Sequence, residues 1–140
     1  MRILDAGRLA SSAMNRQPYQ FLVATQKDVL TKLSSACNQD WSAPVMLAVI
    51  CSPKQAWVRE DGEEFWKADA AIALNQILLA AHAERLGGCW VSAFHEDEVK
   101  QILGLSSDDR VAYLATLGYP DEFKGPISNR KTLDSLVRFI

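Results

Sequence analysis

A short polar run near the start of the chain holds residue types that are well suited to binding a heterocyclic ligand. Within LASSAMNRQPYQFLVAT, residues 9–25, Ser12, Asn15 and Gln17 supply hydroxyl and amide groups that both donate and accept hydrogen bonds. Pro18 fixes the backbone just before an apolar segment. A ring edged with carbonyls and nitrogens needs such a mixed set, but the same residues also suit a polar turn that ends a helix. Both interpretations fit the spacing.

Other chemistries lack the residues that they require. His82 and His95 do not neighbour a nucleophile in an arrangement known for hydrolysis, and no glycine-rich phosphate loop follows a strand. Cys37, Cys51 and Cys89 are odd in number and widely spaced, which is typical neither of a metal site nor of a secreted disulfide framework. We therefore predict no catalytic acid–base pair and no bound metal, and we expect the cysteines to pack in the core.

The composition predicts one globular domain over residues 1–140. Apolar residues make up 49% of the chain, charged residues 23%, and the net charge is -2, values typical of a folded protein of this size. The lack of a basic cluster argues against nucleic acid or an anionic membrane as a partner. The apolar stretches are too short to cross a bilayer, and the opening MRILDAGRLASSA does not resemble a signal peptide. We therefore expect a cytoplasmic protein.

Hydrophobic periodicity predicts helices and strands that alternate along the chain. Apolar runs typical of strands cover residues 21–25, 45–51, 89–94 and 111–120, and helical spacing covers residues 2–10, a segment that ends near 37, an alanine-rich segment around 68–83, and 95–105. Gly87 and Gly88 are expected to end the alanine-rich helix, because glycine accepts the backbone geometry of a helix end. This order predicts an α+β fold around one sheet.

Four segments together resemble the FMN-dependent nitroreductase family. RLASSAMNRQPYQFLVAT is similar to the family's helix end, polar turn and strand, and ADAAIALNQILLAAHAERLGGCWVSAFHEDEVKQILGL to its long central helix with the strand and helix that follow. LATLGYPDE and NRKTLDSLVRF resemble its closing strand and basic tail. The resemblance covers nearly the whole chain. It implies a nitroreductase-like central mixed sheet flanked by helices, in a dimer.

The resemblance also implies where a flavin would bind. Ser12, Asn15 and Gln17 match positions at which the family places polar groups near the flavin, often contributed by the partner subunit. Ser92 and Ala93 match positions whose backbone amides approach the flavin nitrogen that accepts and donates hydride. Only the backbone matters there, so the small side chain at position 93 is adequate.

Two further positions take roles from the resemblance. Arg130 lies where a basic residue of the tail reaches the FMN phosphate, which suits a guanidinium group. Trp66 lies just before the central helix, where the family often carries aromatic residues over the flavin. It is either a substrate contact or a core residue, since aromatic residues at helix starts commonly pack inside. No catalytic side chain is implied, because the flavin itself carries the chemistry.

The function implied by the resemblance is an FMN-dependent oxidoreductase. It would take hydride from NADH or NADPH and pass electrons to a nitroaromatic, a quinone or a similar electron-poor small molecule, and it would act as a homodimer. One departure stands out, because only seven residues precede Arg8, where the family carries an additional helix with phosphate-binding arginines. We thus expect residues 1–140 to form a short, N-terminally truncated member. The alternative is a non-catalytic or weakly flavin-binding scaffold of the same fold.

Overall fold

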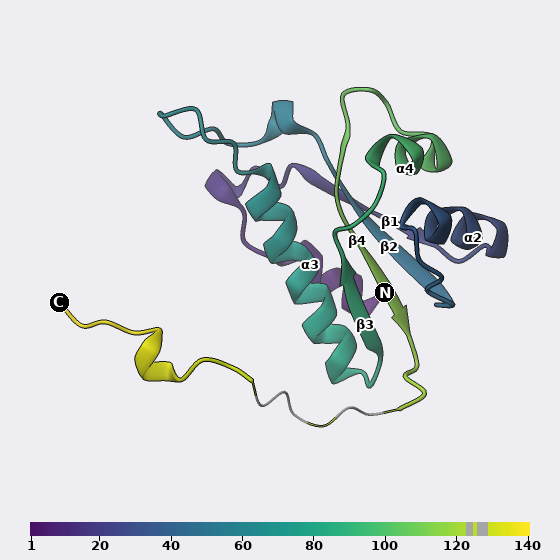
Figure 1. Cartoon of the computed structure of the whole chain (residues 1–140). Coiled ribbons are helices and arrows are strands. Elements are labelled where there is room, and N and C mark those ends of the chain that lie inside the picture. The colour runs from purple at the N-terminus through teal and green to yellow at the C-terminus, as the bar shows by residue number, and fades with distance from the viewer. Residues whose placement is uncertain (123–124, 126–128) are drawn as a thin grey trace.

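The computed structural model describes residues 1–122, 125 and 129–140. Four helices surround a four-stranded sheet whose strand order is β1-β2-β4-β3 (Figure 1). The helices are α1 (Arg2–Arg8), α2 (Lys27–Ala36), α3 (Trp66–Ala83) and α4 (Glu96–Leu103), and the strands are β1 (Tyr19–Ala24), β2 (Val45–Cys51), β3 (Gly87–Val91) and β4 (Arg110–Gly118). The predicted α+β class is thus confirmed, and the strand predicted over residues 45–51 has the bounds of β2.

Every pair of neighbouring strands is antiparallel, so the expectation of a mixed sheet is wrong for the described residues. β2 and β3 do run in the same direction, but β4 lies between them and is antiparallel to both. No parallel pair therefore forms. β2 is buried on both faces and along both edges, as its unbroken apolar run VMLAVIC predicted.

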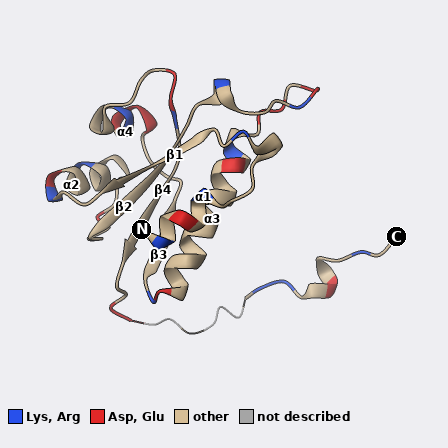
Figure 2. Ribbon diagram, turned by 180° about the vertical axis from the view of Figure 1, so that it is seen from behind, with Lys and Arg blue, Asp and Glu red and all other residues tan. Residues whose placement is uncertain are grey.

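The sheet separates two apolar layers. One layer packs β2 and β4 against α2 and α4 through residues such as Leu33, Met46 and Val99. The other layer packs the opposite face against α3, with α1 beside α3 and also close to β1. In that layer Gly7 of α1 lies directly on Ile77 of α3, because a Cβ at position 7 would come within 2.6 Å of the isoleucine Cδ1. Charged residues of both signs are interspersed over the helices and loops, whereas the strands carry few (Figure 2).

The two adjacent glycines begin a strand and do not end the helix before them. α3 ends at Ala83, and the chain turns through Arg85, whose φ is 63°. Gly88 lies in β3, where a Cβ would come within 2.7 Å of Leu78 Cδ2. Gly88 therefore allows the edge strand to approach α3, so packing and not helix capping explains this glycine. The expected strand over residues 89–94 is correspondingly displaced toward the N-terminus.

The C-terminal segment leads away from the sheet and helices (Figure 1). Residues 129–140 are all exposed, including Leu133, Leu136 and Phe139. Their hydrogen bonds to other described residues stay within the segment and form one short helical turn, Leu133–Ser135. Among the described helices, none is long and apolar enough to cross a membrane.

Candidate functional site

The polar run predicted to bind a ligand forms a tight loop between α1 and β1. A short helical turn, Ala13–Asn15, lies at its centre, and the loop closes on itself through Gln17. The Gln17 backbone amide donates to Ser12 Oγ over 3.0 Å, and its side-chain Nε2 donates to Asn15 O over 3.0 Å and to Asn15 Oδ1 over 3.2 Å. Asn15 and Gln17 are exposed and Ser12 is half-buried. The three predicted residues are therefore brought together at the surface.

This loop is held in an unfavourable backbone conformation. Met14, Asn15 and Gln17 have φ values of 49°, 53° and 48°, in the left-handed region that suits glycine. For other residues that region costs about 1–2 kcal/mol each. Such strain persists only where surrounding structure holds the backbone in place, and it is often found at functional sites.

The loop is attached to the body of the protein by a buried acid in α3. Asp69 Oδ1 accepts a 2.8 Å hydrogen bond from the Ala13 backbone amide, and the aspartate is 1% exposed. Burial raises the pKa of Asp69, although the bond from Ala13 opposes that shift. A weaker attachment is the 3.5 Å bond from the Tyr19 hydroxyl to Ala10 O. The loop thus rests on α3 and β1.

A largely apolar groove lies beside this loop. Its volume is about 690 Å³. It is lined by side chains of α1, by Gln17 at the end of the loop, and by Tyr19 and Phe21 of β1, whose rings stack with centroids 5.4 Å apart. The groove therefore connects one predicted flavin contact with an aromatic surface.

The second predicted group lies where β3 leaves the sheet. β3 ends at Val91, paired with Leu114 of β4, so Ser92 and Ala93 follow the last strand pair. Both residues are exposed. Within the described part of the chain, neither backbone amide donates a hydrogen bond. Two backbone donors at the end of the strand thus lack a protein partner among the described residues, as a site that binds through its backbone requires.

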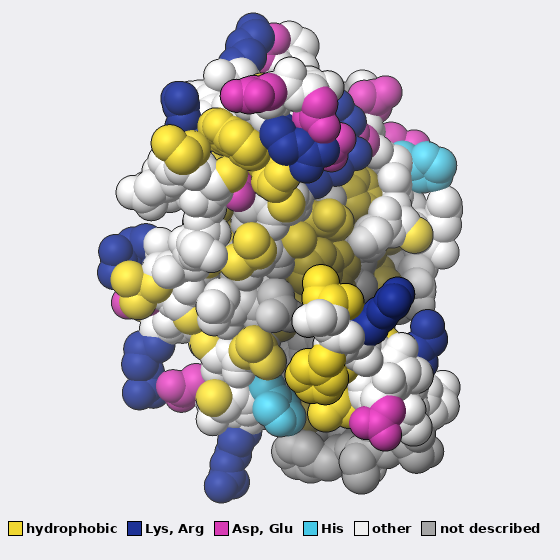
Figure 3. All heavy atoms as spheres, turned by 90° about the vertical axis from the view of Figure 1, so that its left-hand side faces the viewer, with side chains coloured by type: hydrophobic (Ala, Val, Ile, Leu, Met, Phe, Trp, Pro, Cys, Tyr) yellow, Lys and Arg dark blue, Asp and Glu magenta, His cyan; other side chains and the backbone are white. Residues whose placement is uncertain are grey.

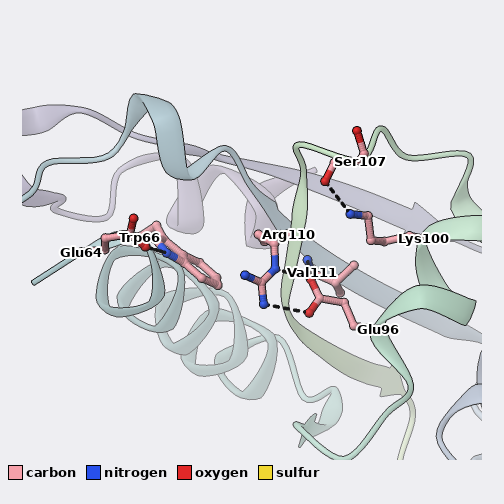
Figure 4. A network of polar contacts seen from close by, with 7 residues as sticks. All are labelled: Glu64, Trp66, Glu96, Lys100, Ser107, Arg110 and Val111. Carbon is pink, nitrogen blue, oxygen red and sulfur yellow. Dashed lines mark hydrogen bonds and ion pairs between the residues drawn. The ribbon is translucent and has the colours of Figure 1, made fainter.

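Trp66 begins α3 and is 4% exposed. Its indole Nε1 donates to Glu64 Oε2 over 2.9 Å, and the Arg110 guanidinium lies 5.2 Å from its ring centroid (Figure 4). Lys67 Nζ also approaches the ring, at 5.1 Å. Cations favour such positions over the π-system of tryptophan. In this chain, therefore, the ring packs in the core and contacts two cations, which is the core alternative set out for it.

The Arg110 side chain is in turn held by Glu96 of α4. Its Nε and Nη2 donate to the two carboxylate oxygens over 2.7 and 3.0 Å, and the Val111 amide adds a 3.0 Å bond to Oε1 (Figure 4). The hydrogen bonds from the Arg110 side chain, together with that from the Val111 backbone amide, hold the pKa of Glu96 below its usual value. This network connects the start of α4 to the start of β4, and so supports the short segment that carries Ser92 and Ala93.

Comparison with known proteins decides the family. The model of the Nitroreductase family matches residues 1–45 and 38–119. The chain is also 30% identical over 127 residues to an Archaeoglobus fulgidus protein named "Putative NADH dehydrogenase/NAD(P)H nitroreductase", a match that covers 88% of this chain and 73% of the relative. The chain belongs to the nitroreductase family.

Solved structures of nitroreductases have the same fold. A nitroreductase family protein from Clostridium difficile 630 superposes with a TM-score of 0.91 at 26% identity, over 99% of this chain and 83% of that one. An FMN-dependent nitroreductase from C. difficile R20291 gives a TM-score of 0.84 at 26% identity, over 99% and 84%. The resemblance seen in the sequence motifs is confirmed at the level of family and fold.

Within one chain, hydrogen bonds do not join the predicted flavin residues into one cluster among the described residues. Among the described residues, no hydrogen bond or ion pair joins the loop of residues 12–17 to Ser92 or Ala93. Arg130 is exposed and belongs to the C-terminal segment, which leads away from the sheet and helices (Figure 1). The described residues contain no group of three or more His, Cys, Asp or Glu side chains suited to a metal.

Sequence reasoning missed two parts of this nitroreductase site, Asp69 and the Glu96–Arg110 pair. A signal for Asp69 was present, because it is an acid on the same helical face as Trp66 and Ala73 within a segment rich in alanine. An acid on an apolar face indicates a buried partner. The Glu96–Arg110 pair joins residues 14 positions apart, and no local pattern marks such a contact.

Proposed function

We propose that the protein is an FMN-dependent NAD(P)H oxidoreductase that passes electrons to an electron-poor small molecule such as a nitroaromatic or a quinone. The observation that carries the proposal is the pair of backbone amides at Ser92 and Ala93, which have no hydrogen-bond partner in the described part of the chain and lie at the end of an edge strand. Family membership adds support, as do the NAD(P)H nitroreductase name of the archaeal relative and the FMN-dependent nitroreductase among the similar structures.

The chemistry of the donor set fits FMN. The flavin ring has both acceptor and donor edges, and the exposed hydroxyl and amide groups of Ser12, Asn15 and Gln17 can serve both. The amides of Ser92 and Ala93 are donors suited to a ring nitrogen. Arg130 would bind the FMN phosphate, because a guanidinium binds phosphate with paired hydrogen bonds.

A homodimer would complete this site. Among the described residues, no hydrogen bond joins the loop of residues 12–17 to Ser92, Ala93 or Arg130, which supports a site to which a second copy contributes part of the set. Apolar side chains on the outer face of α3, Ile72 and Leu79, are 40% and 59% exposed, and hydrophobic side chains gather on this side of the molecule (Figure 3). Together with the apolar C-terminal segment, they offer a surface that a second copy would cover.

When bound, FMN supplies the redox chemistry, taking a hydride from NADH or NADPH and passing electrons to the second substrate. The chain's own residues bind and orient. The closed loop presents the Asn15 and Gln17 amides in fixed positions, since their hydrogen bonds to each other restrict rotation. The backbone donors at residues 92 and 93 are held by the adjoining β3 and α4, so they need little reorganisation to bind. No side-chain acid or base is required.

The deciding experiment is the visible absorption spectrum of the purified protein before and after addition of FMN and desalting. We expect flavin absorbance to be retained near one FMN per chain, and NADH or NADPH to bleach it. A folded dimer that retains no flavin and gains no thermal stability from added FMN would contradict the proposal. That result would favour the non-catalytic scaffold.

A further inference from the structure

The acid beneath the candidate flavin loop is buried at a cost that packing does not explain. Asp69 is 1% exposed, and while its Oδ1 accepts the Ala13 amide, its Oδ2 is buried without a hydrogen-bond partner among the described residues. A buried carboxylate is normally paired or fully hydrogen-bonded. An apolar residue at this position of α3 would avoid the penalty. The acid is therefore explained better by a role in the loop than by a role in folding.

The loop needs an external attachment. Its positive φ values at Met14, Asn15 and Gln17 store strain, and its other hydrogen bonds, from Gln17 to Ser12 and to Asn15, are internal to it. Internal bonds do not fix the loop relative to the helices. Among the described side chains outside the loop, Asp69 makes a 2.8 Å bond to its backbone, whereas the Tyr19 hydroxyl bonds to Ala10 O, before the loop begins.

We propose that Asp69 is a positioning residue, which holds the loop of residues 12–17 in its strained conformation and thereby sets the affinity of the site for FMN. The part about FMN rests on the proposed function, whereas the part about the loop does not. Asp69 acts through the Ala13 amide and touches no ligand itself.

The groups around Asp69 do not compensate its buried charge, so the acid lowers the stability of the fold. Besides burial, the Asp69 charge raises the pKa of two neighbouring groups, Tyr19 of β1 and Cys51 of β2. Both groups are neutral at pH 7, so neither compensates a carboxylate. Burial raises the pKa of Cys51 to about 12 and raises that of Tyr19. The pKa of Asp69 is likewise raised by burial. Residues that serve function are often retained at such a cost to stability.

The test compares three variants with the wild type. Asp69→Ala removes the acceptor, and Asp69→Asn keeps a carbonyl oxygen that can accept from the Ala13 amide. Leu33→Ala is the control, because Leu33 is 1% exposed in α2 on the other face of the sheet and its truncation lowers stability without touching the loop. Each protein is digested with trypsin without FMN, cleavage after the exposed Arg16 is timed by mass spectrometry, and the Kd for FMN is measured by flavin fluorescence.

Loss of a hydrogen bond to a charged group should raise the open population of the loop about tenfold to a hundredfold. We expect Asp69→Ala to speed cleavage after Arg16 by that factor, and to weaken FMN binding beyond the range of the controls because a smaller fraction of the loop is closed, at temperatures where every variant is folded. Asp69→Asn and Leu33→Ala should stay within about threefold of wild type in Kd, well below the factor for a lost charged hydrogen bond.

Unchanged cleavage after Arg16 in Asp69→Ala would overturn the inference, and so would an equal increase in Leu33→Ala. Faster cleavage with an unchanged Kd would overturn the connection to FMN. If the wild type itself does not bind FMN, the proposed function fails, but the digestion still decides whether Asp69 holds the loop. The failures of the two proposals are thus distinguishable.

Discussion

Glu96, the first residue of α4, receives both a two-pronged bond from the Arg110 side chain and a bond from the Val111 amide at the start of β4. The contact fixes the start of α4 against the sheet. The candidate backbone donors, Ser92 and Ala93, lie only a few residues before it. The contact is therefore a structural support for the turn between β3 and α4, and its strength should depend on pH.

Glu96→Gln should lower the free energy of unfolding at pH 7 by about 1 kcal/mol, a value reduced for the solvent exposure of the pair. Because Arg110 lowers the folded-state pKa of Glu96, the stabilisation is present above its ordinary value of 4.5 and is lost as pH falls through the folded-state pKa. The difference between wild type and variant should therefore shrink below pH 4.5. Urea unfolding at several pH values measures it, with Glu98→Gln on the exposed side of α4 as the control.

Gly88→Ala should lower stability by about 1–3 kcal/mol, because the added methyl would be crowded against atoms that fill the space around it. The added methyl would come within 2.7 Å of Leu78 Cδ2 and 3.2 Å of Thr116 O, and the backbone oxygen cannot move aside. Gly87→Ala is the matched control, since the nearest atom to its added methyl is 3.4 Å away. Equal melting temperatures of the two variants would show that β3 does not approach α3 this closely.

Arg130→Ala should weaken FMN retention about tenfold to a hundredfold if this residue binds the phosphate, because a charge-assisted contact is lost. Stability without FMN should not change, since Arg130 is exposed and makes no hydrogen bond to another described residue. Fluorescence titration with FMN measures the Kd, and Arg138→Ala, in the same exposed segment, is the control. An unchanged Kd would remove Arg130 from the site.

Replacing Leu136 and Phe139 by aspartate should shift a homodimer toward monomer, because these side chains are 64% and 94% exposed in the single chain and need an apolar partner surface. Light scattering should give twice the chain mass of 15.5 kDa for the wild type and a lower mass for the variant at equal concentration. Lys32→Glu, on the outer side of α2, should leave the mass unchanged. A monomeric wild type would refute the dimer.

Local patterns predicted the strands and helices well where burial follows the sequence directly. The apolar run of β2 and the periodic apolar faces of α2 and α4 are buried as their patterns predicted. Gly104 ends α4 with a φ of 65°, as expected of a glycine cap. The role of Gly87 and Gly88 was not predictable in the same way. The same residue type permits both a helix end and a close approach of chains, and only the tertiary contact with α3 distinguishes them.

In the candidate site too, contacts between residues close in sequence could be predicted, whereas contacts between distant segments could not. Ser12, Asn15 and Gln17 lie within six residues of one another, so their meeting in one loop could be expected from the chain itself. Asp69 and the Glu96–Arg110 pair join segments that are distant in sequence, and their partners depend on how the elements pack. Cys89 was expected in the core but is exposed, because β3 is an edge strand.

The division of the core by the sheet has a practical meaning for protein engineering. The candidate loop, its buried acid and Trp66 adjoin the layer that packs against α3, whereas the layer under α2 and α4 holds none of the candidate side chains. In the part of that second layer formed by α2 and β2, at positions such as Leu33 and Met46, substitutions can change stability without touching the candidate residues. Val91 and Val99 of the same layer, in contrast, adjoin the segment that carries Ser92 and Ala93. A library aimed at new substrates and one aimed at heat tolerance can thus be built on different sets of positions and combined afterwards.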